Sequence, residues 1–82
     1  MKHAIPLTRD YKTDNLLVIN EQGRIRRIYT PFRVLCINTC RSVIKNSWMY
    51  VQKISVNEKH ELLYLIAEEF YLYDLFRIYI NF

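Results

Sequence analysis

Glycine, proline and cysteine are scarce in this 82-residue chain, which contains one Gly, two Pro and two Cys. So few Gly and Pro residues exclude collagen-like and low-complexity sequence, and two cysteines are too few for a disulfide scaffold. One glycine is also too few for a glycine-rich phosphate-binding loop. No apolar run approaches the about 18 residues of a membrane helix, and no apolar segment follows Lys2 as a secretory signal requires. We therefore expect a cytoplasmic protein with reduced cysteines.

The residues that are abundant are those of a folded domain. Hydrophobic residues make up 51% of the chain and aromatic residues 15%, which excludes intrinsic disorder. The length allows one small domain. Residues 1–15 are polar, are interrupted by Pro6 and lack periodicity, so we expect an N-terminal arm there. Residues 16–82 are expected to form a single small β domain.

Charge is distributed unevenly along the chain. The formal net charge is +4, but residues 1–53 hold ten basic and three acidic side chains, whereas residues 54–82 hold two basic and five acidic ones. A basic front half is compatible with an anionic partner such as nucleic acid. We favour the alternative, in which the charges of the two halves balance on a solvated surface, because uneven charge alone is weak evidence for a partner.

Several segments have the composition of β-strands. Leu16–Ile19 and Arg24–Tyr29 flank a turn that contains Gly23, and this arrangement predicts a hairpin. Phe32–Ile37 is apolar on both faces and is expected to be a central strand. Trp48–Val56 alternates between two faces, as half-buried strands do.

These strands and the C-terminal segment supply the predicted core. We place the following residues in it: Val18, Ile25, Val34, Cys36, Trp48, Tyr50, Val51, Ile54, Leu63, Leu65, Phe76, Ile78 and Ile80.

The segment 61–76 allows two interpretations. As a helix at about 58–74 it would place Leu62, Ile66 and Phe70 on one face, and Ser55–Glu58 matches a capping box; the fold would then be α+β, with one helix on an antiparallel sheet. As strands, Leu62–Ile66 would turn back at Ala67–Glu69. The tyrosines and Phe70 favour strands, so we predict a mostly β fold.

One resemblance supports the strands. The run WMYVQKISVNEKHELLYLIAEEFYLYDLFRIYI resembles the second half of a small SH3-like β-barrel, and it is similar to small uncharacterised bacterial domains of that kind. The resemblance implies about five strands. It also implies a 3₁₀ turn at Tyr73–Phe76 before the last strand, Arg77–Ile80.

Groups for catalysis or metal binding are few. His3, Cys36, Cys40 and His60 lack the paired spacings of a zinc site. No nucleophile has an evident base beside it. We therefore predict a non-enzymatic protein with no cofactor and no metal.

Two binding functions remain, and we expect protein binding ahead of nucleic-acid binding. The resemblance to SH3-like barrels implies a peptide groove, for which the candidate aromatic residues are Tyr50, Tyr64, Tyr71, Tyr73 and Tyr79. A nucleic-acid surface would use clustered arginines for phosphates and rings for bases, with Arg24, Arg26, Arg27, Tyr29 and Arg33 as the candidates. A strand edge at Phe76–Phe82 would alternatively support self-association.

Overall fold

The protein is a mostly β domain built from antiparallel strands. The computed structural model describes residues 2–82. One 3₁₀ turn, η1 (Tyr73–Leu75), precedes the last strand, as predicted. The strands are β1 (Lys2–Lys12), β2 (Asn15–Ile19), β3 (Ile25–Tyr29), β4 (Phe32–Cys36), β5 (Trp48–Val51), β6 (Lys53–Val56), β7 (Leu62–Ile66), β8 (Glu69–Leu72) and β9 (Phe76–Ile80).

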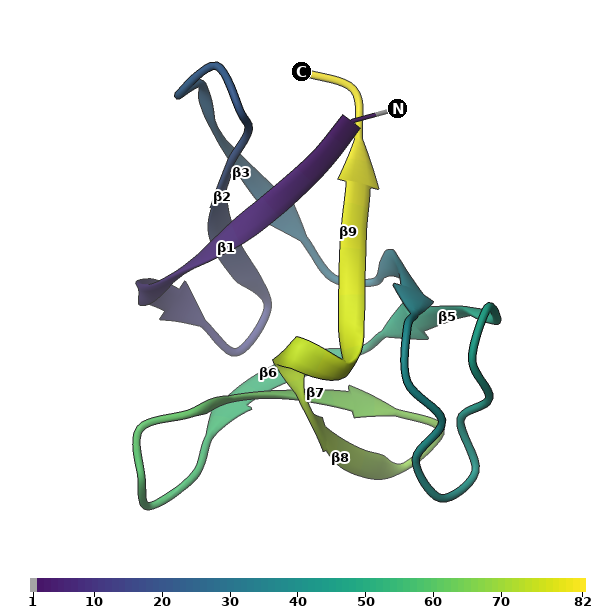
Figure 1. Ribbon diagram of the computed structural model, residues 1–82. Coiled ribbons are helices and arrows are strands. Elements are labelled where there is room, and N and C mark those ends of the chain that lie inside the picture. The colour runs from purple at the N-terminus through teal and green to yellow at the C-terminus, as the bar shows by residue number, and fades with distance from the viewer. Residues whose placement is uncertain (1) are drawn as a thin grey trace.

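The strands form two sheets (Figure 1). The larger has the order β3-β2-β1-β9-β4-β5 and the smaller the order β6-β7-β8. Neighbouring strands within each sheet are antiparallel. β9 lies between β1 and β4, so the Phe76–Phe82 segment does not offer the free strand edge expected for self-association.

The N-terminal segment is part of the larger sheet. β1 pairs with β2 on one side, where Ile5 lies opposite Ile19, and with β9 on the other, where Lys2 lies opposite Ile80. Ala4 on this strand is buried in the core. The expectation of an arm over residues 1–15 is therefore wrong for the described residues. The register with β2 shifts between Pro6 and Tyr11, which breaks the alternation of a regular strand, and the other partner, β9, lies at the opposite end of the chain.

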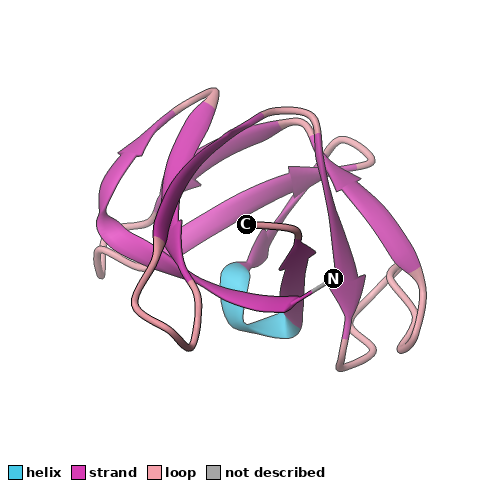
Figure 2. Ribbon diagram, turned by 90° about the horizontal axis from the view of Figure 1, so that it is seen from above, coloured by secondary structure: helices cyan, strands magenta, loops and turns pink. Residues whose placement is uncertain are grey.

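The chain passes between the two sheets twice, at Gln52 between β5 and β6 and at η1 between β8 and β9. β5 belongs to the larger sheet and β6 to the smaller, and Gln52 separates them. The Gln52 N–H donates to the Leu65 carbonyl at 2.8 Å, and the Ile54 N–H donates to the Thr13 carbonyl at 2.8 Å. Seen from above, the strands are strongly curved (Figure 2). In the part of the chain described, nine strands form two sheets and no closed barrel, whereas about five strands were expected.

The segment 61–76 forms β7, β8 and η1, so the alternative helix at about 58–74 is wrong. β7 and β8 make a hairpin in which Ile66 lies opposite Glu69. The two residues between them, Ala67 and Glu68, have φ angles of 49° and 68°. A two-residue hairpin turn with both φ angles positive matches strand twist, although such turns usually use Asn and Gly.

The β2–β3 hairpin closes through an asparagine side chain. The Oδ1 atom of Asn20 accepts hydrogen bonds from the backbone N–H groups of Gln22 at 3.0 Å and Arg24 at 2.9 Å. The Gly23 N–H donates to the Asn20 carbonyl at 3.1 Å, and Gly23 has φ = 80°. The predicted role of Gly23 as the residue with positive φ is confirmed.

The β6–β7 hairpin repeats this turn with different residues. The Oδ1 atom of Asn57 accepts from the N–H groups of Lys59 at 2.9 Å and Glu61 at 3.0 Å. The position equivalent to Gly23 is His60, whose N–H donates to the Asn57 carbonyl at 3.0 Å and whose φ is 63°. A side chain with a Cβ atom therefore occupies a backbone conformation that favours glycine.

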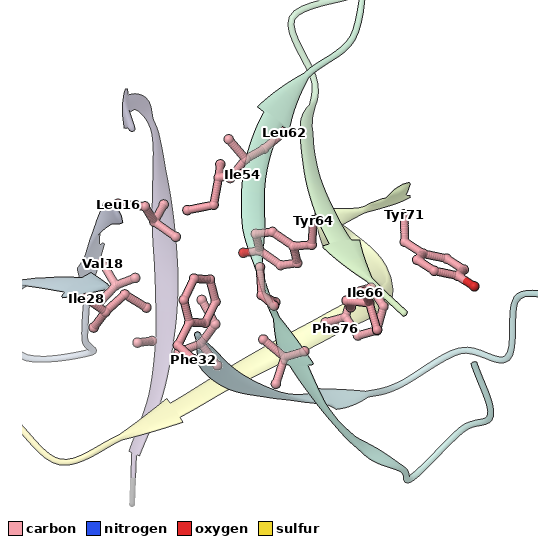
Figure 3. Packing of buried hydrophobic residues seen from close by; sticks show 14 of the residues in the cluster. Leu16, Val18, Ile28, Phe32, Ile54, Leu62, Tyr64, Ile66, Tyr71 and Phe76 are labelled. Atoms are coloured by element: carbon pink, nitrogen blue, oxygen red, sulfur yellow. The ribbon is translucent and has the colours of Figure 1, made fainter. Parts of the chain in front are cut away.

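The core lies between the two sheets, with Tyr64 of β7 and Phe32 of β4 packed edge to face near its centre (Figure 3). Tyr64 is 1% exposed. The buried apolar side chains are Ala4, Leu16, Val18, Ile28, Phe32, Val34, Cys36, Val43, Val51, Ile54, Leu62, Tyr64, Ile66, Tyr71, Phe76 and Ile78.

The predicted core is correct for seven of its members, namely Val18, Val34, Cys36, Val51, Ile54, Phe76 and Ile78. Ile80 is half-buried against the core. Leu63 and Leu65 are half-buried on the other face of β7, since Leu62, Tyr64 and Ile66 point inward instead. Ile25, Trp48 and Tyr50 are exposed.

Candidate functional site

The outer face of the larger sheet carries an unusual set of side chains. Side chains alternate across a strand, and burial fixes which of them point away from the core. In β4, Val34 is buried and Arg33 and Leu35 point outward; in β5, Val51 is buried and Trp48 and Tyr50 point outward. In β9 the outward residues are Arg77 and Tyr79, beside buried Phe76 and Ile78. His3 and Ile5 are their counterparts on β1, on either side of buried Ala4.

Four of these side chains, from four neighbouring strands, contact one another. We call Arg33, Trp48, Tyr79 and His3 the outer aromatic row. The Arg33 guanidinium carbon lies 4.2 Å from the centroid of the Trp48 ring. Trp48 meets Tyr79 edge to face at 6.1 Å between centroids, and Tyr79 lies 5.6 Å from the His3 ring. The row crosses β5, β4, β9 and β1 through side-chain contacts.

Strand register places two further residues beside the row. Tyr50, which is 58% exposed, lies opposite Arg33 across the β4–β5 pair. Leu35 lies opposite both Trp48 and Arg77, so Arg77 flanks the row on β9. Trp48 itself is 42% exposed, which leaves a substantial part of the ring open to a ligand.

The charge on this face has one sign among the outward side chains that the structure describes. Arg33 on β4 and Arg77 on β9 are basic, as is Arg27, which points outward on β3 beside buried Ile28. None of the outward positions named above for β1, β4, β5 and β9 is Asp or Glu. Arg stacks through its planar face and binds phosphate through its N–H edge. The face therefore combines aromatic surface with groups that bind anions.

The predicted arginine cluster is divided by the fold. Arg33 belongs to the outer aromatic row, but three strands separate β3 from β4. Arg27 and Tyr29 point outward at the β3 edge, where the Arg27 Nη1 atom donates to the Asn15 Oδ1 atom at 2.5 Å. Arg24 and Arg26 alternate to the opposite side of β3. The five residues therefore do not form one site.

Arg24 and Arg26 lie near the C-terminal end of the chain instead. An Arg26 Nη1 atom donates to the Asn81 carbonyl. Arg24 lines a shallow hollow with Asn20, Asn81 and Phe82. These two arginines therefore belong to a different part of the surface from the outer aromatic row.

The predicted tyrosine groove is also not formed. Tyr64 and Tyr71 are buried, and Tyr73 is half-buried against the core. Burial, with a smaller contribution from the nearby Tyr73, raises the pKa of Tyr64 well above its usual value. Of the five candidates, Tyr50 and Tyr79 lie at the outer aromatic row.

A second arginine–aromatic pair lies at the edge of the smaller sheet. The Arg41 guanidinium carbon is 4.3 Å from the centroid of the Tyr71 ring. Its Nη2 atom donates to the Phe70 carbonyl at 2.5 Å, and its Nε atom is 3.6 Å from a Glu69 carboxylate oxygen. Arg41 thus covers the free edge of β8 and already contacts Glu69, Phe70 and Tyr71 of the same chain. We therefore interpret this pair as a cover that prevents the β8 edge from pairing with other strands.

Catalytic and metal-binding groups do not converge in the part of the chain described. Cys36 is a buried free thiol whose Sγ atom lies 3.1 Å from the Asn38 carbonyl, and Cys40 is a half-buried free thiol. His60 is exposed in a turn. No group of three His, Cys, Asp or Glu residues within 2–82 is placed to hold a metal ion, and within the same range no helix is long and apolar enough to cross a membrane.

No family model, curated protein or solved structure matches this chain. The outer aromatic row is therefore the feature of this chain from which a function can be inferred. Sequence reasoning identified Arg33, Tyr50 and Tyr79 but missed His3, Trp48 and Arg77. The sequence does contain a signal for two of these residues: Trp48 is two positions from Tyr50, and Arg77 is two positions from Tyr79, so each pair shares one face of a strand.

Proposed function

We propose that this protein binds single-stranded nucleic acid on the outer face of its larger sheet. The observation that carries the proposal is the outer aromatic row, with Arg33 stacked on a half-exposed Trp48 and Tyr79 linking that ring to His3. Proteins that bind single strands combine aromatic rings, on which bases stack, with basic groups that follow the backbone. The described outward side chains supply both, without an acidic residue among them.

The arrangement favours single strands over duplexes. In a duplex each base is covered by its neighbours, so the base faces are not available to protein rings; in a single strand they can be splayed onto them. The rings here lie on a sheet face rather than on a helix that could enter a groove. Affinity should then come from stacking, and electrostatic attraction should add a dependence on salt.

The test is fluorescence anisotropy of a labelled 12-nucleotide dT strand and of a labelled duplex, titrated with protein at low and at near-physiological salt. We expect the single strand to bind more tightly and Trp48→Ala to weaken it by about 5- to 150-fold, the value of one stacked base. Phe70→Ala removes a 46% exposed ring on β8 and is the matched control. Equal binding of wild type and W48A, or no binding at low salt, would contradict the proposal.

A protein partner is the second candidate, on a different observation. Ile5, Ile19 and Ile25 lie opposite one another across β1, β2 and β3, and Ile5 and Ile25 are each 57% exposed. An exposed apolar row is typical of a protein contact, and SH3-like modules bind extended peptides through apolar and aromatic surfaces. Affinity capture with wild type and with an Ile5→Ser, Ile25→Ser variant separates the two candidates. A partner lost with this variant but kept by W48A would favour protein binding.

A further inference from the structure

We infer, on the basis of the proposed function, that the site holds a short strand of about three nucleotides running across the sheet from β5 to β1. The rings and the guanidinium of the outer aromatic row come from β5, β4, β9 and β1, which are consecutive in the sheet. The ligand therefore crosses the protein strands rather than following one of them.

The width of the row limits the ligand. Neighbouring strands are about 4.8 Å apart, so β5 and β1 are separated by about 14 Å. A nucleic-acid strand with stacked bases advances about 3.4 Å per nucleotide, which gives at most about four nucleotides. A strand that spreads its bases onto separate rings advances further per nucleotide and places fewer of them on the row.

Both ends of the row are bounded. On one side β5 is the edge strand of the sheet. On the other side the outward residues are Ile5, Ile19 and Ile25, which form an uncharged apolar row across β1, β2 and β3. The next outward basic and aromatic residues, Arg27 and Tyr29, lie towards the other end of β3. A longer strand therefore meets no further phosphate-binding group next to the row.

The number of arginines beside the outer aromatic row agrees with a ligand of about three nucleotides. Arg33 on β4 and Arg77 on β9 flank the rings, and three nucleotides are joined by two phosphates. Each phosphate neutralised on a single strand contributes about 0.7 to the slope of log affinity against log salt. Two contacts therefore predict a slope of roughly −1.4.

The experiment is a titration of ¹⁵N-labelled protein with unlabelled dT strands of two, three, four, six and twelve nucleotides, followed by amide and Trp48 indole N–H shifts. Affinity should rise steeply up to three or four nucleotides. Between four and twelve nucleotides the affinity should rise by no more than about tenfold, because a longer strand only offers more positions at which the same site can bind. The salt slope for the four-nucleotide strand should be roughly −1.4.

Two results would overturn the inference in distinguishable ways. Affinity that keeps rising beyond about tenfold between four and twelve nucleotides, with shifts spreading to Arg27 and Tyr29, would show a longer path and leave the proposed function intact. The absence of shifts at the outer aromatic row with every strand would reject both the short footprint and the proposed function.

Discussion

Arg33 and Trp48 form a cation–π pair across the β4–β5 ladder, with 4.2 Å between the guanidinium carbon and the ring centroid. Trp48 pairs in register with Leu35 and Arg33 pairs with Tyr50, so the contact is a diagonal one on the outer face. Such a pair contributes about 0.5–1 kcal/mol at an exposed site. It holds the indole ring in place on the surface, where a base can stack against the same cluster.

Trp48→Ala should lower the free energy of unfolding less than the truncation of a buried side chain does. Because the side chain is 42% exposed, its truncation should cost less free energy of unfolding than the about 3–5 kcal/mol of a buried Trp. Ile54→Ala removes a buried side chain and should cost about 2–5 kcal/mol. Urea unfolding of both variants measures this; a W48A cost equal to or above that of I54A would place Trp48 in the core.

The arginines should differ in their effect on salt dependence. Arg33→Gln and Arg77→Gln should each reduce the magnitude of the salt slope by about 0.7. Arg24→Gln removes the same charge from the opposite side of β3 and is the matched control. The measurement is the affinity for a dT strand over a salt series, and an R24Q effect as large as that of R33Q would indicate diffuse attraction without a defined site.

Tyr64 should make the free energy of unfolding depend on alkaline pH. Burial raises the pKa of Tyr64 in the folded protein, whereas an unfolded chain releases a tyrosine proton near a pKa of 10. This contribution to stability is therefore complete below about pH 10 and decreases as the pH rises above it. Urea midpoints between pH 8 and pH 11 should fall less in Tyr64→Phe than in wild type; parallel curves would contradict the account.

The N-terminal strand should be essential for folding. Ala4 on β1 is 1% exposed, so Ala4→Asp buries an unpaired charge, which costs several kcal/mol, an amount comparable to the free energy of unfolding of a small domain. Ile5→Asp places the same charge at the next, outward position, which is 57% exposed, and should leave the fold intact. Thermal unfolding followed by circular dichroism compares the two, and a normal transition for A4D would mean that this segment is dispensable.

The two asparagine-closed turns should respond in opposite ways to glycine exchange. His60 and Gly23 hold equivalent positions with φ angles of 63° and 80°. A residue with a Cβ atom costs about 1–2 kcal/mol in this conformation, offset in part by the greater freedom of glycine in the unfolded chain. His60→Gly should therefore stabilise the protein by about 0.5–1 kcal/mol, and Gly23→Ala should destabilise it by a similar amount. Denaturant midpoints measure both changes in stability. A lower midpoint for H60G than for wild type would contradict the expected stabilisation.

Local sequence patterns predicted those parts of the fold that local interactions determine. Glycine in the Asn20–Arg24 turn indicated a hairpin, and tyrosines indicated strands in place of a helix over 61–76. The faces of the strands were harder to predict. Gln52 interrupts the alternation between Val51 and Ile54, which both point inward. β7 is apolar on both faces, so its pattern cannot distinguish Leu63 from Tyr64.

The candidate site depended on contacts that sequence patterns do not contain. Arg33 could be identified as a basic residue beside aromatic ones. Its contact with Trp48 depends on the register of β4 and β5, and the continuation to Tyr79 and His3 depends on pairing between the two ends of the chain. Long-range pairing of this kind leaves no periodic signal. In β1 the register shift between Pro6 and Tyr11 also removes the local alternation that would predict a strand.

The most direct test of the central claim uses the fluorescence of Trp48, the single tryptophan of the chain. Unlabelled dT strand is titrated into the protein at low salt, with an equal concentration of duplex as the comparison. We expect saturable quenching by the single strand, weak or absent quenching by the duplex, and a loss of apparent affinity in Arg33→Gln. Unchanged Trp48 emission at saturating single strand would contradict the central claim.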